Sequence, residues 1–150
     1  MSDEGARDAG PLLEATLTRI EASFAAQGLM KTLGARIEHI ARARVVIAAP
    51  IRPEVAQQMG FAHAGLSFAI GDSAAGYAAL SVMDPDTEVV TTEMKIHLLA
   101  PATGETLRAE GRVVRAGRRL VVVAADIFAL DGAREQHTAT LLGTMMPIGP

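Results

Sequence analysis

Apolar residues recur at helical spacing near the start of the chain. Leu13 and Leu17 are four residues apart, and so are Ile20 and Phe24, which places each pair on one face of a helix. We therefore expect a first helix over residues 11–26.

The next segments predict β structure and then one long apolar helix. Apolar and charged residues partly alternate over residues 35–50, which is typical of strands. Residues 54–62 are consistent with a loop or a short turn of helix. Residues 63–83 are almost all apolar or small, which predicts a second helix that is buried on most sides.

The remainder of the chain has the pattern of strands separated by turn residues. We expect these strands over residues 88–99, 105–115, 120–130 and 134–146. Joined in sequence they predict an antiparallel meander, so the fold class is α+β: an antiparallel sheet around one long central helix, with an extra N-terminal helix.

The acidic start of the chain lacks the basic and apolar runs of a secretory signal. We expect a mobile tail over residues 1–10 and a single domain over residues 11–150.

Composition removes several classes of function. The net charge of −3 and the 3% of aromatic residues argue against a nucleic-acid-binding module. With no cysteine, a disulfide scaffold, a Cys-ligated zinc site and a thiol nucleophile are all impossible. The absence of cysteine is compatible with the reducing cytoplasm, where we expect the protein to act. His39, His97 and His137 lack the spacing of metal ligands, so we expect no metal site.

One carboxylate stands out in the predicted central helix. Between Glu54 and Asp84 the only formally charged side chain is Asp72. An aspartate at the centre of a membrane span costs roughly 2.5–3.5 kcal/mol, so we expect a buried helix and no membrane segment. A lone carboxylate in such a helix is either hydrogen-bonded for packing alone, or acts as a general base or nucleophile in a partly dry cleft. The residues alone leave both roles open.

The N-terminus of this helix is a second candidate. A helix start presents unpaired N–H groups and the positive end of the helix dipole. Gly65 would let a substrate oxygen approach the backbone closely, as in an oxyanion hole. The simpler interpretation is a glycine-rich helix entry with His63 near the cap.

Two segments together resemble a known family. They are Gln57-Gln58-Met59-Gly60-Phe61-Ala62-His63-Ala64-Gly65 and Ile70-Gly71-Asp72-Ser73-Ala74-Ala75-Gly76. Both are similar to motifs of the hotdog-fold acyl-CoA thioesterases, in the PaaI-type and 4-hydroxybenzoyl-CoA thioesterase group. Those motifs read Asn-x-x-Gly-x-x-His-Gly-Gly and Ala-Asp-x-Ala-x-Gly, so Gln57 or Gln58 replaces the asparagine and Ala64 replaces the middle glycine.

The resemblance implies a sheet wrapped around the central helix, a homodimer with its active site at the interface, and a further pairing of dimers into a tetramer. Asp72 of one subunit would attack the thioester carbonyl or activate a water. The Gly65 N–H of the other subunit would polarise the carbonyl oxygen, and His63 would set this loop. We expect hydrolysis of acyl-CoA, with the coenzyme A thioester as substrate and no cofactor.

The site residues that the resemblance implies fall into two groups. The catalytic group is Asp72, Gly65, His63 and Gln57. The substrate-binding group is Gln58, Gly60, Ala64, Ser73, Gly76, Thr91 and Thr92. The altered residues at positions 57 and 64 leave open an alternative function, a non-catalytic hotdog module that binds acyl-CoA as a sensor or scaffold.

Overall fold

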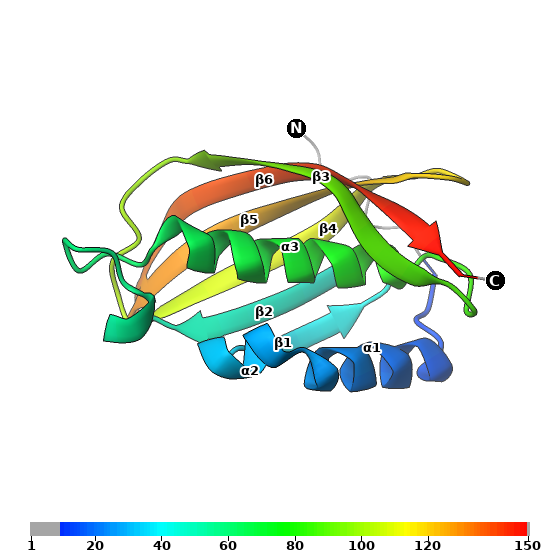
Figure 1. Ribbon diagram of the computed structural model, residues 1–150, viewed down its shortest axis with the longest axis horizontal. Coiled ribbons are helices and arrows are strands. Elements are labelled where there is room, and N and C mark those ends of the chain that lie inside the picture. Colours follow the sequence, from blue (N-terminus) through cyan, green and yellow to red (C-terminus); the bar gives the residue numbers. More distant parts are fainter. Residues whose placement is uncertain (1–9, 150) are drawn as a thin grey trace.

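The computed structural model describes residues 10–149, and Figure 1 shows the arrangement of its elements. The helices are α1 (Glu14–Ala26), α2 (Gly28–Leu33) and α3 (Ala64–Leu80), with a short 3-10 turn, η2 (Pro53–Val55). The strands are β1 (Arg36–Ala41), β2 (Arg44–Pro50), β3 (Glu88–Leu98), β4 (Thr106–Ala116), β5 (Val121–Asp131) and β6 (Arg134–Ile148). The tail expected over residues 1–10 lies outside the described residues, apart from Gly10.

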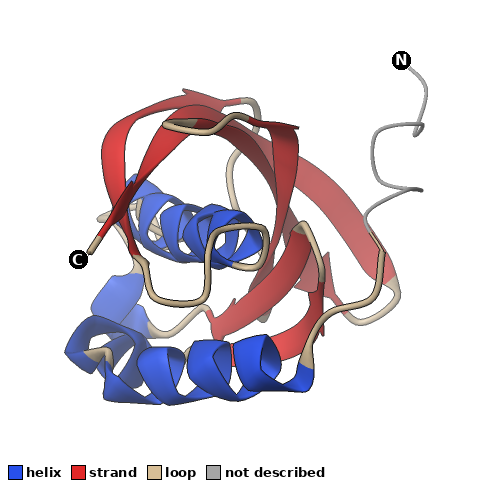
Figure 2. Ribbon diagram, turned by 90° about the vertical axis from the view of Figure 1, so that its right-hand side faces the viewer, coloured by secondary structure: helices blue, strands red, loops and turns tan. Residues whose placement is uncertain are grey.

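The strands form one antiparallel sheet in the order β1-β2-β4-β5-β6-β3. Figure 2 shows that the sheet curls around α3, while α1 lies across the open side below it. The predicted α+β class, with an antiparallel sheet around one central helix and an additional N-terminal helix, is confirmed.

The predicted meander of four strands is wrong in the position of β3. Strands β4, β5 and β6 are neighbours in sequence order, but β3 pairs with β6 and not with β4. The connection over residues 99–105 is too long for a tight hairpin and passes the start of α3, where the Ala62 N–H donates to the Ala102 carbonyl (2.9 Å). β3 therefore lies at an edge of the sheet, with β6 as its neighbour on one side.

Residues 35–50 form two strands joined by a tight turn that has no glycine or proline. Ala43 in this turn adopts a left-handed conformation (φ 66°). Its N–H donates to Ser81 Oγ (2.7 Å), and its carbonyl accepts from the Val113 N–H (2.9 Å). These tertiary hydrogen bonds stabilise a turn that local sequence does not reveal. Helix α2 was not expected from the residue pattern; it is capped by Gly34 in a left-handed conformation (φ 65°).

Small residues on α3 allow the sheet to approach its backbone. A Cβ added to Gly111 of β4 would overlap the Ala74 backbone, and one added to Gly71 would stand 2.9 Å from Leu141 Cδ2. The glycines and alanines of α3 thus serve the close packing that their abundance predicts. Among the described residues, no helix is long and apolar enough to cross a membrane.

Helix α1 covers the side of α3 that the sheet leaves open. Ile20 is fully buried, and the Phe24 ring meets the Tyr77 ring edge-on at 6.2 Å. In the connection between α3 and β3, the Arg19 guanidinium donates to the carbonyl oxygens of Pro85 and Thr87. The helix is therefore part of the core, and it leaves one face of α3 exposed beside β3.

Candidate active site

The exposed face of α3 carries the helix's one carboxylate. Gly65 is exposed, Phe68 is 37% exposed and Asp72 is half-buried. Their spacing of three and four residues places them on one face of the helix. β3 lies beside this face, because Thr91 on β3 contacts Asp72. A helix face and a sheet edge are therefore exposed side by side.

Asp72 is held by one hydroxyl group. The Thr91 hydroxyl donates to Asp72 Oδ1 at 2.7 Å. Burial raises the pKa of Asp72 above its ordinary value, and the hydrogen bond from Thr91 opposes that rise. A half-buried carboxylate with a raised pKa and a fixed orientation is suited to act as a base or nucleophile.

If Asp72 acts as the base or nucleophile of an enzyme, Thr91→Val should move the acid limb of the kcat/KM profile to higher pH, because the hydrogen bond that lowers the pKa of Asp72 is lost. Because the lost hydrogen bond stabilises the charged form of Asp72, kcat/KM should also fall about tenfold at neutral pH. The matched control is Thr140→Val, which removes the same kind of bond at Asp126 (2.8 Å) on β5. An acid limb that stays in place in Thr91→Val would contradict this role for Thr91.

Asp72→Asn should raise the Tm at pH 7. Because burial raises the pKa of Asp72, the folded state binds this proton more tightly than the unfolded chain does. Protonated Asp72 makes its full contribution to the free energy of unfolding below its ordinary pKa. This contribution is lost as the pH rises through the raised pKa. Thermal unfolding of both proteins should therefore differ at neutral pH and converge below about pH 4. A lower Tm for the variant at neutral pH would contradict the argument.

His63 caps the N-terminus of α3 with its own side chain. Its Nδ1 accepts a hydrogen bond from the Gly65 N–H at 2.8 Å. The proton of the neutral imidazole therefore lies on Nε2, and the ring itself is exposed. In this conformation the Gly65 N–H is engaged, so a substrate oxygen would bind it only by replacing the imidazole.

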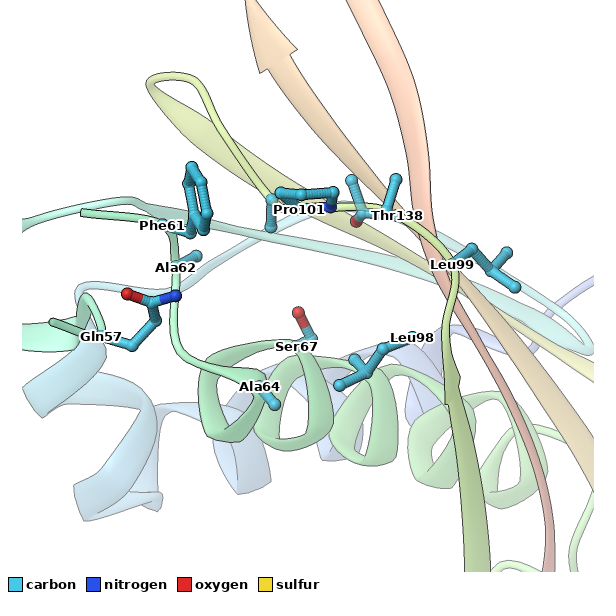
Figure 3. A pocket seen from close by; sticks show the side chains of 11 residues that line it. Gln57, Phe61, Ala62, Ala64, Ser67, Leu98, Leu99, Pro101 and Thr138 are labelled. Carbon is cyan, nitrogen blue, oxygen red and sulfur yellow. The ribbon is translucent and has the colours of Figure 1, made fainter. Parts of the chain in front are cut away.

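Gln57 and Gln58 have different environments in the loop before α3. The Gln57 N–H donates to the Phe61 carbonyl (2.8 Å), and the Gly60 N–H donates to the Gln57 carbonyl (2.9 Å). Gln57 Oε1 accepts from the Met59 N–H, so the side-chain amide nitrogen points toward the pocket described next (Figure 3). Gln58 is exposed and does not line this pocket.

A pocket of about 400 Å³ lies between this loop, the start of α3 and the segment after β3 (Figure 3). Its lining is mostly apolar and comprises Gln57, Phe61, Ala62, Ala64, Ser67, Leu98, Leu99, Ala100, Pro101, Ala102 and Thr138. The volume is in the range of small-molecule sites. Ala64 and Gln57 were predicted as site residues. Ser67 and Thr138 were missed, because only the fold brings their side chains to this pocket.

The other predicted site residues lie in different environments. Gly60 has φ 84°, which a side chain would strain, and Ser73 is half-buried next to Asp72. Gly76 is buried, with Met145 Cε 3.8 Å from an added Cβ. The Thr92 hydroxyl donates to the Thr144 carbonyl (3.0 Å) on β6, while only its neighbour Thr91 contacts Asp72.

The structure groups the predicted catalytic residues at two separate points of one chain. The start of α3 and the loop before it carry His63, Gly65 and Gln57. Asp72 lies seven residues after Gly65, a rise of about 10 Å along the helix. Nucleophilic attack needs reacting atoms about 3–3.5 Å apart. Asp72 therefore does not reach a carbonyl held at the Gly65 N–H of its own chain. Among residues 10–149, no group of three or more His, Asp or Glu side chains could hold a metal ion.

Comparison with known proteins identifies the family. Residues 59–136 match the model of the Thioesterase superfamily. A candidate esterase of Saccharolobus solfataricus is 31% identical over 121 residues, which cover 80% of this chain and 86% of that protein. A 1,4-dihydroxy-2-naphthoyl-CoA hydrolase of Listeria monocytogenes is 25% identical over 91 residues, covering 61% of this chain and 74% of the relative.

Solved structures agree with this assignment. The crystal structure of a thioesterase family protein from Silicibacter pomeroyi has a TM-score of 0.88 and 38% identity, and the match covers 90% of this chain and 99% of that one. The PaaI protein of the E. coli phenylacetic acid degradation operon shares the fold, with a TM-score of 0.82, 22% identity and coverage of 92% and 96%. The chain belongs to the Thioesterase superfamily and has the hotdog fold, and this membership supports thioester hydrolysis as its class of activity.

Proposed function

We propose that the protein hydrolyses acyl-CoA thioesters at a site formed by two copies of the chain. The observation that carries the proposal is Asp72, the one carboxylate of α3, which is half-buried on its exposed face and oriented by Thr91. Coenzyme A as the thiol is supported by the name of the Listeria relative, a CoA hydrolase.

The exposed helix face and the sheet edge support a homodimer. If two α3 helices pack antiparallel about a two-fold axis near Phe68, Asp72 of one copy comes opposite Gly65 of the other. Positions 65 and 72 lie on either side of the axis at nearly equal distances along the helix. The same axis lets the two β3 edges pair, which satisfies backbone groups that an edge strand leaves unpaired.

The reaction begins when the thioester carbonyl oxygen replaces His63 Nδ1 at the Gly65 N–H. The Gln57 amide nitrogen is a second donor on the pocket side of this position. These donors stabilise the negative charge that develops on the oxygen. The positive end of the α3 dipole adds to the same effect.

The carboxylate then has two chemical routes. As nucleophile, Asp72 forms a mixed anhydride with the acyl group and expels the CoA thiolate, and water hydrolyses the anhydride. As general base, it takes a proton from a water that attacks the carbonyl carbon, and the thiolate leaves with the same result. Both routes consume one water, release a carboxylic acid and free CoA, and need no cofactor.

A panel of acyl-CoA thioesters with a thiol-detecting dye tests the proposal. The native protein should release free CoA from at least one acyl class, with equal amounts of the corresponding acid. Binding of acyl-CoA without any release would instead support the alternative function, a sensor or scaffold. Release of neither product from any member of the panel would refute the proposed activity.

Phe68→Glu should convert the dimer into a monomer and lower kcat/KM by about 100-fold, because it places two like charges at the proposed axis. Sedimentation velocity measures the mass and separates monomer, dimer and tetramer. The control is Val114→Glu, a charge added at another exposed apolar position (55% exposed), which should keep the native mass. A Phe68→Glu variant with native mass and activity would place the interface elsewhere.

A further inference from the structure

The Ser67 hydroxyl has no hydrogen-bond partner among the described residues and faces an open pocket. Its side chain lies on α3 and the residue is only 2% exposed. Among the described residues nothing donates to its Oγ or accepts from it, and Figure 3 shows the oxygen directed into the pocket. Water can pair with this hydroxyl while the pocket is empty, but a ligand that fills the pocket must replace that water with a polar atom of its own or leave the hydroxyl unpaired.

The other buried hydroxyl residues behave differently. The Ser81 hydroxyl donates to the Ala78 carbonyl (2.7 Å) and accepts from the Ala43 N–H (2.7 Å). The Thr138 hydroxyl donates to the Ile127 carbonyl (3.2 Å). A helical serine commonly turns its hydroxyl to the carbonyl four residues earlier, but Ser67 does not do so. Its hydroxyl is therefore left available to the pocket.

The pocket extends from the proposed position of the thioester. Ala64, the first residue of α3, lines it, and Ser67 lies one helical turn further on, about 5 Å along the axis. Apart from Gln57, Thr138 and Ser67 itself, the lining side chains are apolar. An apolar cavity of about 400 Å³ with a few polar groups suits a small hydrocarbon segment that carries one polar atom at a fixed position along its length.

We propose that Ser67 is a specificity-determining residue whose hydroxyl donates a hydrogen bond to an oxygen of the thioester substrate lying in this pocket. The proposal rests on the proposed function, since it takes the thioester carbonyl to sit at the start of α3. A pure hydrocarbon in the pocket would leave the buried hydroxyl unpaired, which weakens binding by about tenfold.

Two parts of an acyl-CoA molecule carry an oxygen a few bonds from the thioester. One is an acyl group with an oxygen substituent, and the other is the first amide of the pantetheine arm. Both present the same chemistry to Ser67, a carbonyl or hydroxyl oxygen that can accept a hydrogen bond. They are separated by ligands that contain only one of them.

The test measures binding to three CoA probes by calorimetry. Free CoA has the arm and no acyl group. Two non-hydrolysable thioethers, S-(2-oxohexyl)-CoA and S-(2,5-dioxohexyl)-CoA, mimic thioesters without and with an oxygen on the fourth acyl carbon. Each is titrated into the native protein, Ser67→Ala and Ser67→Cys, the last keeping the side-chain volume with a weaker hydrogen-bonding group.

The matched control is Ser81→Ala, which removes a buried hydroxyl that has two partners. It should lower the Tm and leave all three dissociation constants unchanged. Ser67→Ala removes a hydroxyl with no protein partner, so its Tm should not fall. This contrast separates a ligand-binding hydroxyl from a structural one.

Weaker binding of the dioxo probe alone, by about tenfold in Ser67→Ala, would assign the hydrogen bond to the acyl group. Weaker binding of all three probes would assign it to the pantetheine arm. Unchanged binding of every probe in both Ser67 variants would overturn the inference. Native protein that binds the probes but hydrolyses no thioester would refute the proposed hydrolysis and leave the Ser67 inference standing, whereas native protein that binds no probe would overturn both.

Discussion

Asp72→Asn should lower kcat for thioester hydrolysis by about 10³-fold while the protein stays folded. Both proposed routes need an ionised carboxylate, and the amide is neither a base nor a competent nucleophile. The Asn side chain keeps the shape and can still accept the hydrogen bond from Thr91. The binding of a non-hydrolysable acyl-CoA should therefore change little.

Asp126→Asn is the matched control for this variant. Asp126 is also partly buried and accepts a hydrogen bond from a threonine, Thr140 (2.8 Å), but it lies in the sheet and pairs with Arg112 (2.6 Å). This pairing and the hydrogen bonds lower the pKa of Asp126 despite its burial, which is the opposite of Asp72. The control should lose stability and keep its kcat. An Asp72→Asn variant within tenfold of native kcat would remove Asp72 from the chemistry.

Gly111→Ala should cause the largest loss of stability of the substitutions considered. An added Cβ would overlap the Ala74 backbone and stand 2.5 Å from the Ala75 nitrogen. Neither neighbour is a flexible side chain that could turn aside, so β4 or α3 must shift. The free energy of unfolding should fall by about 3 kcal/mol, and the Tm by about 10 °C.

Gly28→Ala is the control, because no atom lies within 4 Å of a Cβ added at this first residue of α2. It should leave the Tm unchanged or slightly raise it, since alanine favours a helix. Thermal unfolding of the two variants beside the native protein makes the comparison. A native Tm for Gly111→Ala would mean that α3 and β4 do not pack this closely.

The central helix could be predicted from sequence because its signal is local. The run over residues 63–83, in which Asp72 is the one formally charged side chain, contains α3, and only its ends differ. His63 is the cap rather than a helical residue, and the helix stops at Leu80, before Ser81. By contrast, the place of β3 beside β6 depends on how the sheet closes around α3, and no local pattern encodes that order.

Only the part of the site that single residues indicate could be predicted from the sequence. Asp72 is visible as the one charge of an apolar helix, but its contact with Thr91 exists only because β3 lies at the edge beside α3. The use of the Gly65 N–H by His63 depends on a side-chain rotamer. Ser67 and Ser73 look alike in the sequence, and only the fold shows that Ser67 faces the pocket.

In the proposed dimer, each site takes its carboxylate from one subunit and its carbonyl-binding groups from the other. Asp72→Asn and Gln57→Ala, coexpressed with different tags, give mixed dimers that can be isolated. In an interface site, one of the two sites of each mixed dimer has both lesions and the other has none. Mixed dimers should therefore recover about half of the native kcat, far above either parent. A kcat that stays at the mean of the two parents would contradict this arrangement, because each site would then lie within one chain.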